Sequence, residues 1–132
     1  MTSKELEEGV SIQLDFSKLN KIKIDVIPVV VQHATTKDVL ILAYANKEAL
    51  QESIHQKIAV FWSTSLNELW IKGAKSGDYL DLVEIRVNCE QNSLLYLVIP
   101  RQGGVCHTKD KTGATRKSCF YRTLDAEHLR FN

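Results

Sequence analysis

The sequence contains no apolar run that approaches the roughly 18–20 residues needed to cross a bilayer. Its first segment, residues 1–9, also lacks the apolar centre of a signal peptide. We therefore expect a soluble, cytoplasmic protein that has no membrane partner.

The chain also lacks an excess of either charge, because 17 Lys and Arg residues stand against 16 Asp and Glu residues. Nothing in this balance predicts a nucleic-acid partner. Residues 101–122 are an exception, since they hold six basic side chains and only one acidic side chain. A short basic segment of this kind is typical either of a phosphate-binding loop or of a loop that faces water.

Cysteine is scarce, and the three that are present, Cys89, Cys106 and Cys119, cannot all pair within one chain. A disulfide framework is not expected without a secretion signal. The cysteines are therefore metal ligands, a reactive thiol or unrelated structural thiols. Their spacings of 17 and 13 residues match no compact zinc motif.

Apolar side chains make up 44% of the 132 residues, which is enough to build one domain without disulfide or metal support. One segment, Lys47–Lys57, predicts a helix that is capped by Asn46. Runs rich in Val, Ile and Leu predict the strands Val26–Gln32, Val39–Tyr44, Ala59–Trp62, Glu68–Ile71, Tyr79–Val87 and Leu94–Ile99. These elements predict an α+β fold, a mainly antiparallel sheet with one clear helix, in a single domain over residues 1–132.

The stretch 101–118 has no periodicity and contains three glycines. Loops of this length without regular structure are uncommon in compact domains and are often functional. We therefore expect the chemistry to lie here, where Cys106 is followed directly by His107.

Thiolates from Cys89, Cys106 and Cys119 would give zinc three soft ligands and leave one position open, which is the arrangement of a catalytic zinc site. His107 would then be a general base or a fourth ligand. The alternative is a surface histidine without a role.

A set of oxygen donors surrounds the first cysteine. If the strand Tyr79–Val87 continues, Asn88, Glu90 and Asn92 lie on one face of it. Amide and carboxylate oxygens are the ligands that Mg²⁺ prefers. A polar strand end that simply faces water is the alternative, because one carboxylate is little charge with which to hold Mg²⁺.

Aromatic and polar side chains are interleaved in two motifs, Phe61-Trp-Ser-Thr-Ser65 and Leu69-Trp-Ile-Lys-Gly73. Such a surface can stack a nucleotide base and bind a phosphate. Two tryptophans in adjacent strands can equally belong to the core.

These motifs follow one another in the order found in one family. They occur together with Asp38-Val-Leu-Ile-Leu-Ala-Tyr-Ala-Asn-Lys-Glu-Ala-Leu50, Ser76-Gly77, Asn88-Cys-Glu90, Cys106-His-Thr108 and Ser118-Cys-Phe120. The chain thereby resembles the phosphoribosyl-AMP cyclohydrolases over about residues 15–122. The resemblance implies a step of histidine biosynthesis, in which zinc-bound hydroxide opens the adenine ring of N1-(5-phosphoribosyl)-AMP between N1 and C6.

The resemblance also implies an intertwined homodimer in which cysteines from both chains hold zinc. Carried over by position, the zinc ligands are Cys89, Cys106 and Cys119, the magnesium site falls on Asn88, Glu90 and Asn92, and His107 is the candidate base. The positions implied to bind the substrate are Trp62, Ser63, Ser65, Trp70, Lys72, Gly73 and Ser76.

The chain departs from the family pattern around the substrate. Two arginines of the family motif W-S-R-S-R are replaced in Trp62-Ser-Thr-Ser-Leu66, and Ala74 replaces the glutamate of K-G-E-T-S-G. Two of the three magnesium aspartates are asparagines here, so we expect weak magnesium binding. Candidates for replacing the lost phosphate contacts are Lys75, Arg116 and Lys117.

Two other functions fit the same motifs. One is a zinc hydrolase that acts on another purine nucleotide, which would explain the altered pocket. The other is a catalytically weak, zinc-stabilised dimer that only binds nucleotides.

Overall fold

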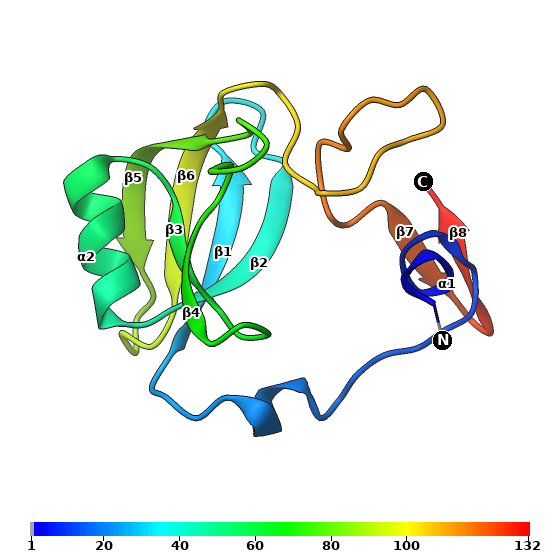
Figure 1. The fold of residues 1–132 in the computed structure, drawn as a ribbon, viewed down its shortest axis with the longest axis horizontal. Coiled ribbons are helices and arrows are strands. Elements are labelled where there is room, and N and C mark those ends of the chain that lie inside the picture. Colours follow the sequence, from blue (N-terminus) through cyan, green and yellow to red (C-terminus); the bar gives the residue numbers. More distant parts are fainter. Residues whose placement is uncertain (1) are drawn as a thin grey trace.

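The computed structural model describes residues 2–132 and contains one four-stranded sheet, two hairpins and three short helices (Figure 1). In chain order the elements are α1 (Ser3–Glu8), the 3₁₀ helix η1 (Lys18–Lys21), β1 (Ile27–His33), β2 (Val39–Ala45), α2 (Lys47–Gln56), β3 (Val60–Ser63), β4 (Glu68–Ile71), β5 (Leu80–Val87), β6 (Leu94–Pro100), β7 (Arg122–Asp125) and β8 (His128–Phe131). Among the described residues, no helix has the length and apolar character that a membrane crossing requires.

The main sheet has the strand order β2-β1-β6-β5. The pairs β1–β2 and β5–β6 are antiparallel, and only the central pair β1–β6 is parallel. The mainly antiparallel α+β fold is therefore confirmed. All six expected strands and the expected helix form, and their ends differ from the prediction by at most one residue.

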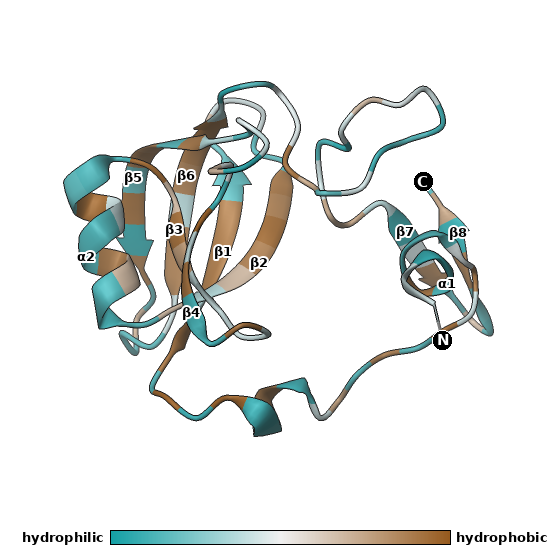
Figure 2. Ribbon diagram, in the orientation of Figure 1, coloured by the Kyte–Doolittle hydropathy of each residue, from teal (hydrophilic) through white to brown (hydrophobic). Residues whose placement is uncertain are grey.

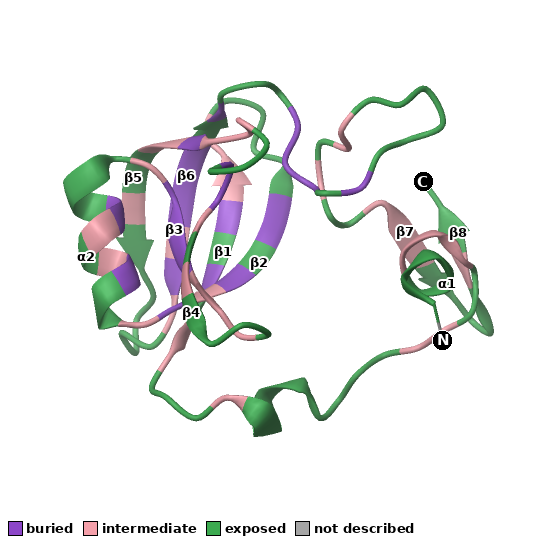
Figure 3. Ribbon diagram, in the orientation of Figure 1, coloured by how far each residue is buried: buried purple, intermediate pink, exposed green. Residues whose placement is uncertain are grey.

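The core lies between the sheet and the layer formed by α2 and the β3–β4 hairpin (Figure 3). Alternation along β1 turns Val29 and Val31 inward, whereas Val30 between them is exposed. Phe61 of β3 stacks on Tyr96 of β6 with ring centroids 5.8 Å apart. The strands of the main sheet and β3 are thus held together by this apolar core. The same strands are the most hydrophobic part of the ribbon (Figure 2).

β5 ends at Val87 and the chain reverses into β6, so the condition for placing Asn88, Glu90 and Asn92 on one strand face is not met. The Asn88 side-chain oxygen accepts hydrogen bonds from the backbone N–H groups of Asn92 (2.9 Å) and Ser93 (3.0 Å). Asparagine side chains readily replace backbone partners in this way and favour turns over strands. Gln91 adopts a positive φ of 54° within the same turn.

The two ends of the chain form a separate unit that lies away from the sheet (Figure 1). Here α1 packs beside the β7–β8 hairpin, and the Leu129 N–H donates to the Val10 carbonyl at 2.7 Å. We call α1, β7 and β8 the terminal module. None of its helical residues is buried, so the module depends on polar contacts more than on a core of its own.

Candidate functional site

A cavity of about 590 Å³ lies between β4, the turn that follows it and the 101–118 loop. Six predicted site residues line it together: Trp70, Lys72, Gly73, Ser76, Cys106 and His107. The long loop is thus brought against the tryptophan–lysine motif. Lys75, a candidate for phosphate contact, lines the same cavity.

Lys72 is the buried cation of this cavity, since only 7% of the residue is exposed. Burial lowers the pKa of Lys72, and this effect is opposed by the negative charges of Asp78, Cys119 and Cys106 nearby. A lysine held in this way offers a poorly hydrated positive charge to an anionic ligand.

Position 73 is a glycine because of its backbone conformation and close surroundings. It adopts a φ of +94°, and a Cβ atom built on it would lie 2.3 Å from the backbone nitrogen of Tyr79. Only glycine satisfies both conditions. Its role is therefore to let the turn after β4 fold closely over the cavity.

Cys106 and Cys119 come together at the base of the loop. Both Val105 and Cys106 donate backbone hydrogen bonds of 3.0 Å to the Arg116 carbonyl. Cys119 donates its backbone N–H to the Leu40 carbonyl at 2.8 Å, which ties the end of the loop to β2. The loop therefore closes on itself beside the sheet and presents two thiols at one place.

The two thiols differ in acidity. The interaction with the Cys119 side chain, followed by the hydrogen bonds from Thr108, lowers the pKa of Cys106 to about 5. The Thr108 hydroxyl lies 3.0 Å from the Cys106 sulfur. The pKa of Cys119 is raised, chiefly because its thiol donates a hydrogen bond to Cys106 and would lose it on deprotonation. One thiolate of the pair thus exists at neutral pH.

Cys89 is not part of this pair. It lies exposed in the β5–β6 turn, at the opposite end of the sheet from the 101–118 loop (Figure 1). The seven residues of β6 separate the two ends, a length of about 20 Å at the rise of an extended strand. Within residues 2–132, no group of three His, Cys, Asp or Glu side chains is placed to hold a metal ion. One chain thus brings together two of the three predicted zinc ligands.

His107 lines the cavity and is mostly exposed, with 77% of its side chain accessible. Its Nε2 atom contacts the Glu7 carboxylate of α1 in a short hydrogen bond. Although it is exposed, His107 therefore has a hydrogen-bond partner on the N-terminal helix α1.

Three predicted substrate residues, Trp62, Ser63 and Ser65, do not line the cavity. Ser63 and Ser65 stabilise the β3–β4 turn instead, where the Ser63 hydroxyl accepts from the Leu66 N–H at 3.1 Å. The indole nitrogen of Trp62 is buried without a hydrogen-bond partner in the described part of the chain.

The magnesium positions lie in the β5–β6 turn, far from the cavity. The Asn88 amide donates to the Asn92 side-chain oxygen at 2.6 Å, so these two side chains are hydrogen-bonded to each other.

Arg116, a candidate for phosphate contact, instead forms an ion pair with Glu8 through two hydrogen bonds.

Some residues around the site were not predicted from the sequence. Asp78 and Lys109 line the cavity, and Glu7 and Glu8 contact the loop. The basic composition of residues 101–122 was a signal for Lys109. No local pattern could have revealed the two glutamates, because 100 positions separate Glu7 from its partner in the loop.

Comparison with known proteins finds one matching family. The family model described as phosphoribosyl-AMP cyclohydrolase matches residues 41–121. A phosphoribosyl-AMP cyclohydrolase of Archaeoglobus fulgidus is 44% identical over 104 residues, which cover 79% of this chain and 90% of the relative. One of Clostridium beijerinckii is 40% identical over 112 residues, with 85% and 93% covered.

A longer relative is similar in the same region. The histidine biosynthesis bifunctional protein HisIE of Thermus thermophilus is 40% identical over 111 residues. The match covers 84% of this chain and 49% of the bifunctional protein.

Proposed function

The chain belongs to the phosphoribosyl-AMP cyclohydrolase family and is a hydrolase of histidine biosynthesis, and we propose that it opens the adenine ring of N1-(5-phosphoribosyl)-AMP between N1 and C6. In this reaction an oxygen–carbon bond forms at C6 and the C6–N1 bond breaks. The proton lost by the attacking water goes to the departing nitrogen. The observation that carries the proposal is the single cavity that joins Trp70 and Lys72 to Cys106 and His107.

The side chains of the cavity match the parts of such a substrate. The partly exposed ring of Trp70 offers a stacking surface for the purine. Lys72, Lys75 and Lys109 supply positive charge for phosphate groups. These lysines stand in for the arginines that the chain lacks, although a lysine acts as a point charge and cannot grip a phosphate with two parallel bonds.

His107 is the proposed general base. It lines the cavity beside Cys106, so it can accept a proton from a water molecule that attacks the ring. Its contact with Glu7 leaves the other ring nitrogen free to do so.

The pair Cys106 and Cys119 suits zinc as the metal. Sulfur ligands select soft cations, and the lowered pKa of Cys106 makes a thiolate available at neutral pH. We infer that Cys89 of the partner subunit completes the set. Zinc, when bound, lowers the pKa of a water molecule to roughly 7 and so supplies a nucleophile at neutral pH.

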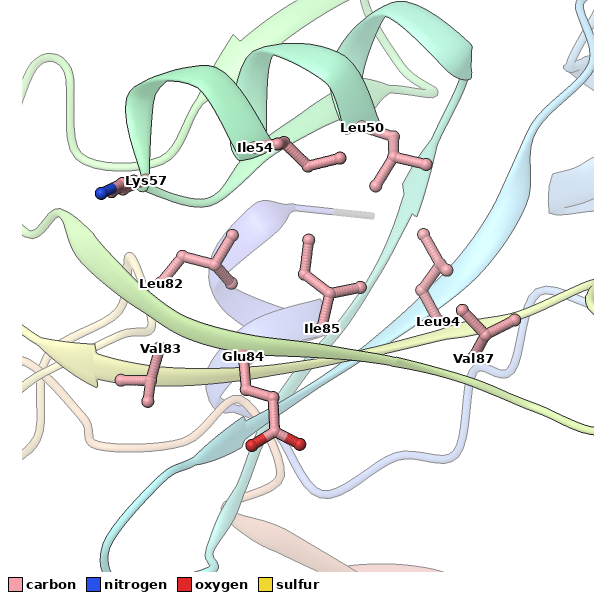
Figure 4. Close-up of a pocket in the computed structure, with 9 residues that line it drawn as sticks. All are labelled: Leu50, Ile54, Lys57, Leu82, Val83, Glu84, Ile85, Val87 and Leu94. Atoms are coloured by element: carbon pink, nitrogen blue, oxygen red, sulfur yellow. The ribbon is translucent and has the colours of Figure 1, made fainter.

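We also infer that the protein works as an intertwined homodimer, located in the cytoplasm. An apolar groove of about 630 Å³ lies open between α2 and β5 (Figure 4). Its side chains include the exposed Ile54, Val83 and Val87, and Val87 is only two positions from Cys89. A second copy packed here would cover apolar surface and place its own loop near this cysteine.

The test of this function is direct turnover. Purified protein with zinc should convert N1-(5-phosphoribosyl)-AMP to the opened imidazole carboxamide, which is followed by its ultraviolet absorbance. AMP and other purine nucleotides serve as controls. Turnover of one of these in place of the N1-ribosylated compound would favour the hydrolase with another substrate. Binding of the N1-ribosylated compound without turnover would favour the nucleotide-binding dimer.

Magnesium should matter little to this activity. Only Glu90 is charged among the three family positions, and the oxygen of Asn88 is already engaged by two backbone N–H groups. Hard cations are held chiefly by carboxylates. We expect the same turnover with and without micromolar Mg²⁺ in zinc-loaded protein, and tighter Mg²⁺ binding by calorimetry after Asn88→Asp combined with Asn92→Asp. Tight Mg²⁺ binding by the unchanged protein would contradict this prediction.

A further inference from the structure

The terminal module lies outside the part of the chain that the family model matches, which is residues 41–121. Its helix α1 and its hairpin β7–β8 come from the two extremes of the chain and pack together (Figure 1). The module also reaches the 101–118 loop through two consecutive glutamates of α1. This contact joins a helix outside the matched region to the candidate site.

The first glutamate contacts the proposed base. The Glu7 carboxylate is hydrogen-bonded to His107 Nε2. A carboxylate that accepts from one ring nitrogen of a histidine fixes the tautomer and the ring orientation, and leaves the other nitrogen as an acceptor. Because 77% of the His107 side chain is exposed, little else holds the ring in one position.

The second glutamate fastens the helix to the loop. Glu8 accepts two hydrogen bonds from the Arg116 guanidinium, at 2.7 and 2.9 Å. Arg116 is only 12% exposed at its side chain and lies over the Tyr121 ring, 4.0 Å from its centroid. The same guanidinium donates to the Thr108 hydroxyl at 3.0 Å, one residue beyond His107.

The position of α1 does not depend on the Glu7 carboxylate. The Tyr121 hydroxyl donates to the Glu7 backbone carbonyl at 2.6 Å, and Arg122 donates to the Gly9 carbonyl at 3.0 Å. Together with the Glu8–Arg116 pair, these bonds hold the helix when the Glu7 side chain is removed. The Glu7 carboxylate is therefore not required to hold α1 in place, and its hydrogen bond goes to His107.

We propose that Glu7 is a positioning residue for the reaction, which orients His107 toward the substrate, and that the terminal module holds Glu7 in place. The proposal rests on the function proposed above, because it assigns a partner to the base of that reaction. It predicts that the N-terminal helix of this chain contributes to the chemical step.

The test compares Glu7→Ala with Glu5→Ala. Glu5 is on the same helix, and its carboxylate forms no ion pair within the described residues, so it is a control for charge and helix formation. Removing a side chain that hydrogen-bonds to a functional group in a site typically lowers activity by about 10–100-fold, so kcat of the Glu7→Ala variant should fall by about that factor. KM and zinc content should not change. Glu7→Gln, which keeps an acceptor without the charge, should fall between the two.

The outcomes separate this proposal from the function on which it rests. If Glu7→Ala matches Glu5→Ala while His107→Ala is impaired, the positioning role is wrong and the base stands. A rise in kcat on removal of Glu7 would also overturn the proposal, because the helix would then restrain the base. Loss of zinc from Glu7→Ala would overturn it as well. An inactive wild-type protein would instead count against the proposed function.

Discussion

Replacing Cys106 with serine should remove zinc from the protein and abolish turnover. Cys106 is the buried member of the thiol pair, and its lowered pKa makes a thiolate available to the proposed zinc site. Loss of an outer partner of a metal ligand already costs about 10–100-fold in affinity, so loss of the ligand itself should cost more than about 100-fold. Metal analysis of protein purified without a chelator should give about one zinc per chain before the substitution and almost none after it.

The same substitution tests how the third ligand is supplied. We expect Cys89→Ser and Cys106→Ser each to yield zinc-free homodimers. When the two variants are co-expressed with different tags and purified through both, each heterodimer has one site with all three cysteines, if the ligands come from two chains. About one zinc and half the wild-type activity per dimer should then return.

The structure makes this exchange experiment decisive. The distance of about 20 Å along β6 prevents Cys89 from joining Cys106 within the fold of one chain. If the heterodimer binds no zinc, the shared site is wrong. If Cys106→Ser retains the zinc of the wild-type protein, zinc binding by these cysteines is wrong altogether.

The strands and the helix could be predicted because their signals are local. A run rich in Val and Ile marks β1, and the Asn46 side chain caps α2 by accepting from the Ala49 N–H at 2.9 Å. Such patterns need only a few neighbouring residues. The two motifs of the cavity could be singled out for a different reason, since the tryptophan–lysine motif and the cysteine–histidine motif each carry chemistry in their own residue types.

The terminal module and the β5–β6 turn could not be predicted in the same way. The helix α1 of the terminal module is six residues long and has no buried position, so no apolar periodicity indicates it. Glu7 and His107 meet because the two chain ends pack together, which no spacing can show. At the turn, the hydrogen bonds of the Asn88 side chain keep the chain from continuing β5 beyond Val87, and no residue pattern shows these bonds in advance.

The incomplete zinc set has a related cause. A motif match identifies three cysteines without stating which chain each belongs to. The fold places Cys106 and Cys119 together and Cys89 far away, a separation for which the proposed homodimer accounts. A sequence motif does not state which chain supplies each residue. A site shared between two chains therefore shows itself only when the motif residues lie far apart in the fold of one chain.

Replacing His107 with alanine should lower kcat by about 10²–10⁴-fold, the usual contribution of a general base. The side chain lines the cavity with Cys106 and contacts Glu7, so its removal takes away the proposed proton acceptor. Zinc content should remain near that of the wild-type protein, since both thiols of this chain are unchanged. Steady-state kinetics and metal analysis on the same preparation measure the two effects separately.

The remaining histidines provide the matched controls for this prediction. His55 lies in the last turn of α2 and His128 in β8, and neither lines the cavity, so their alanine variants should keep nearly full activity. His33 accepts from the backbone N–H groups of Thr35 and Thr36, so its loss should lower stability more than kcat. Loss of zinc together with activity in His107→Ala would make His107 a ligand. Unchanged activity would make it a surface side chain, and a large loss at another histidine would move the proton transfer there.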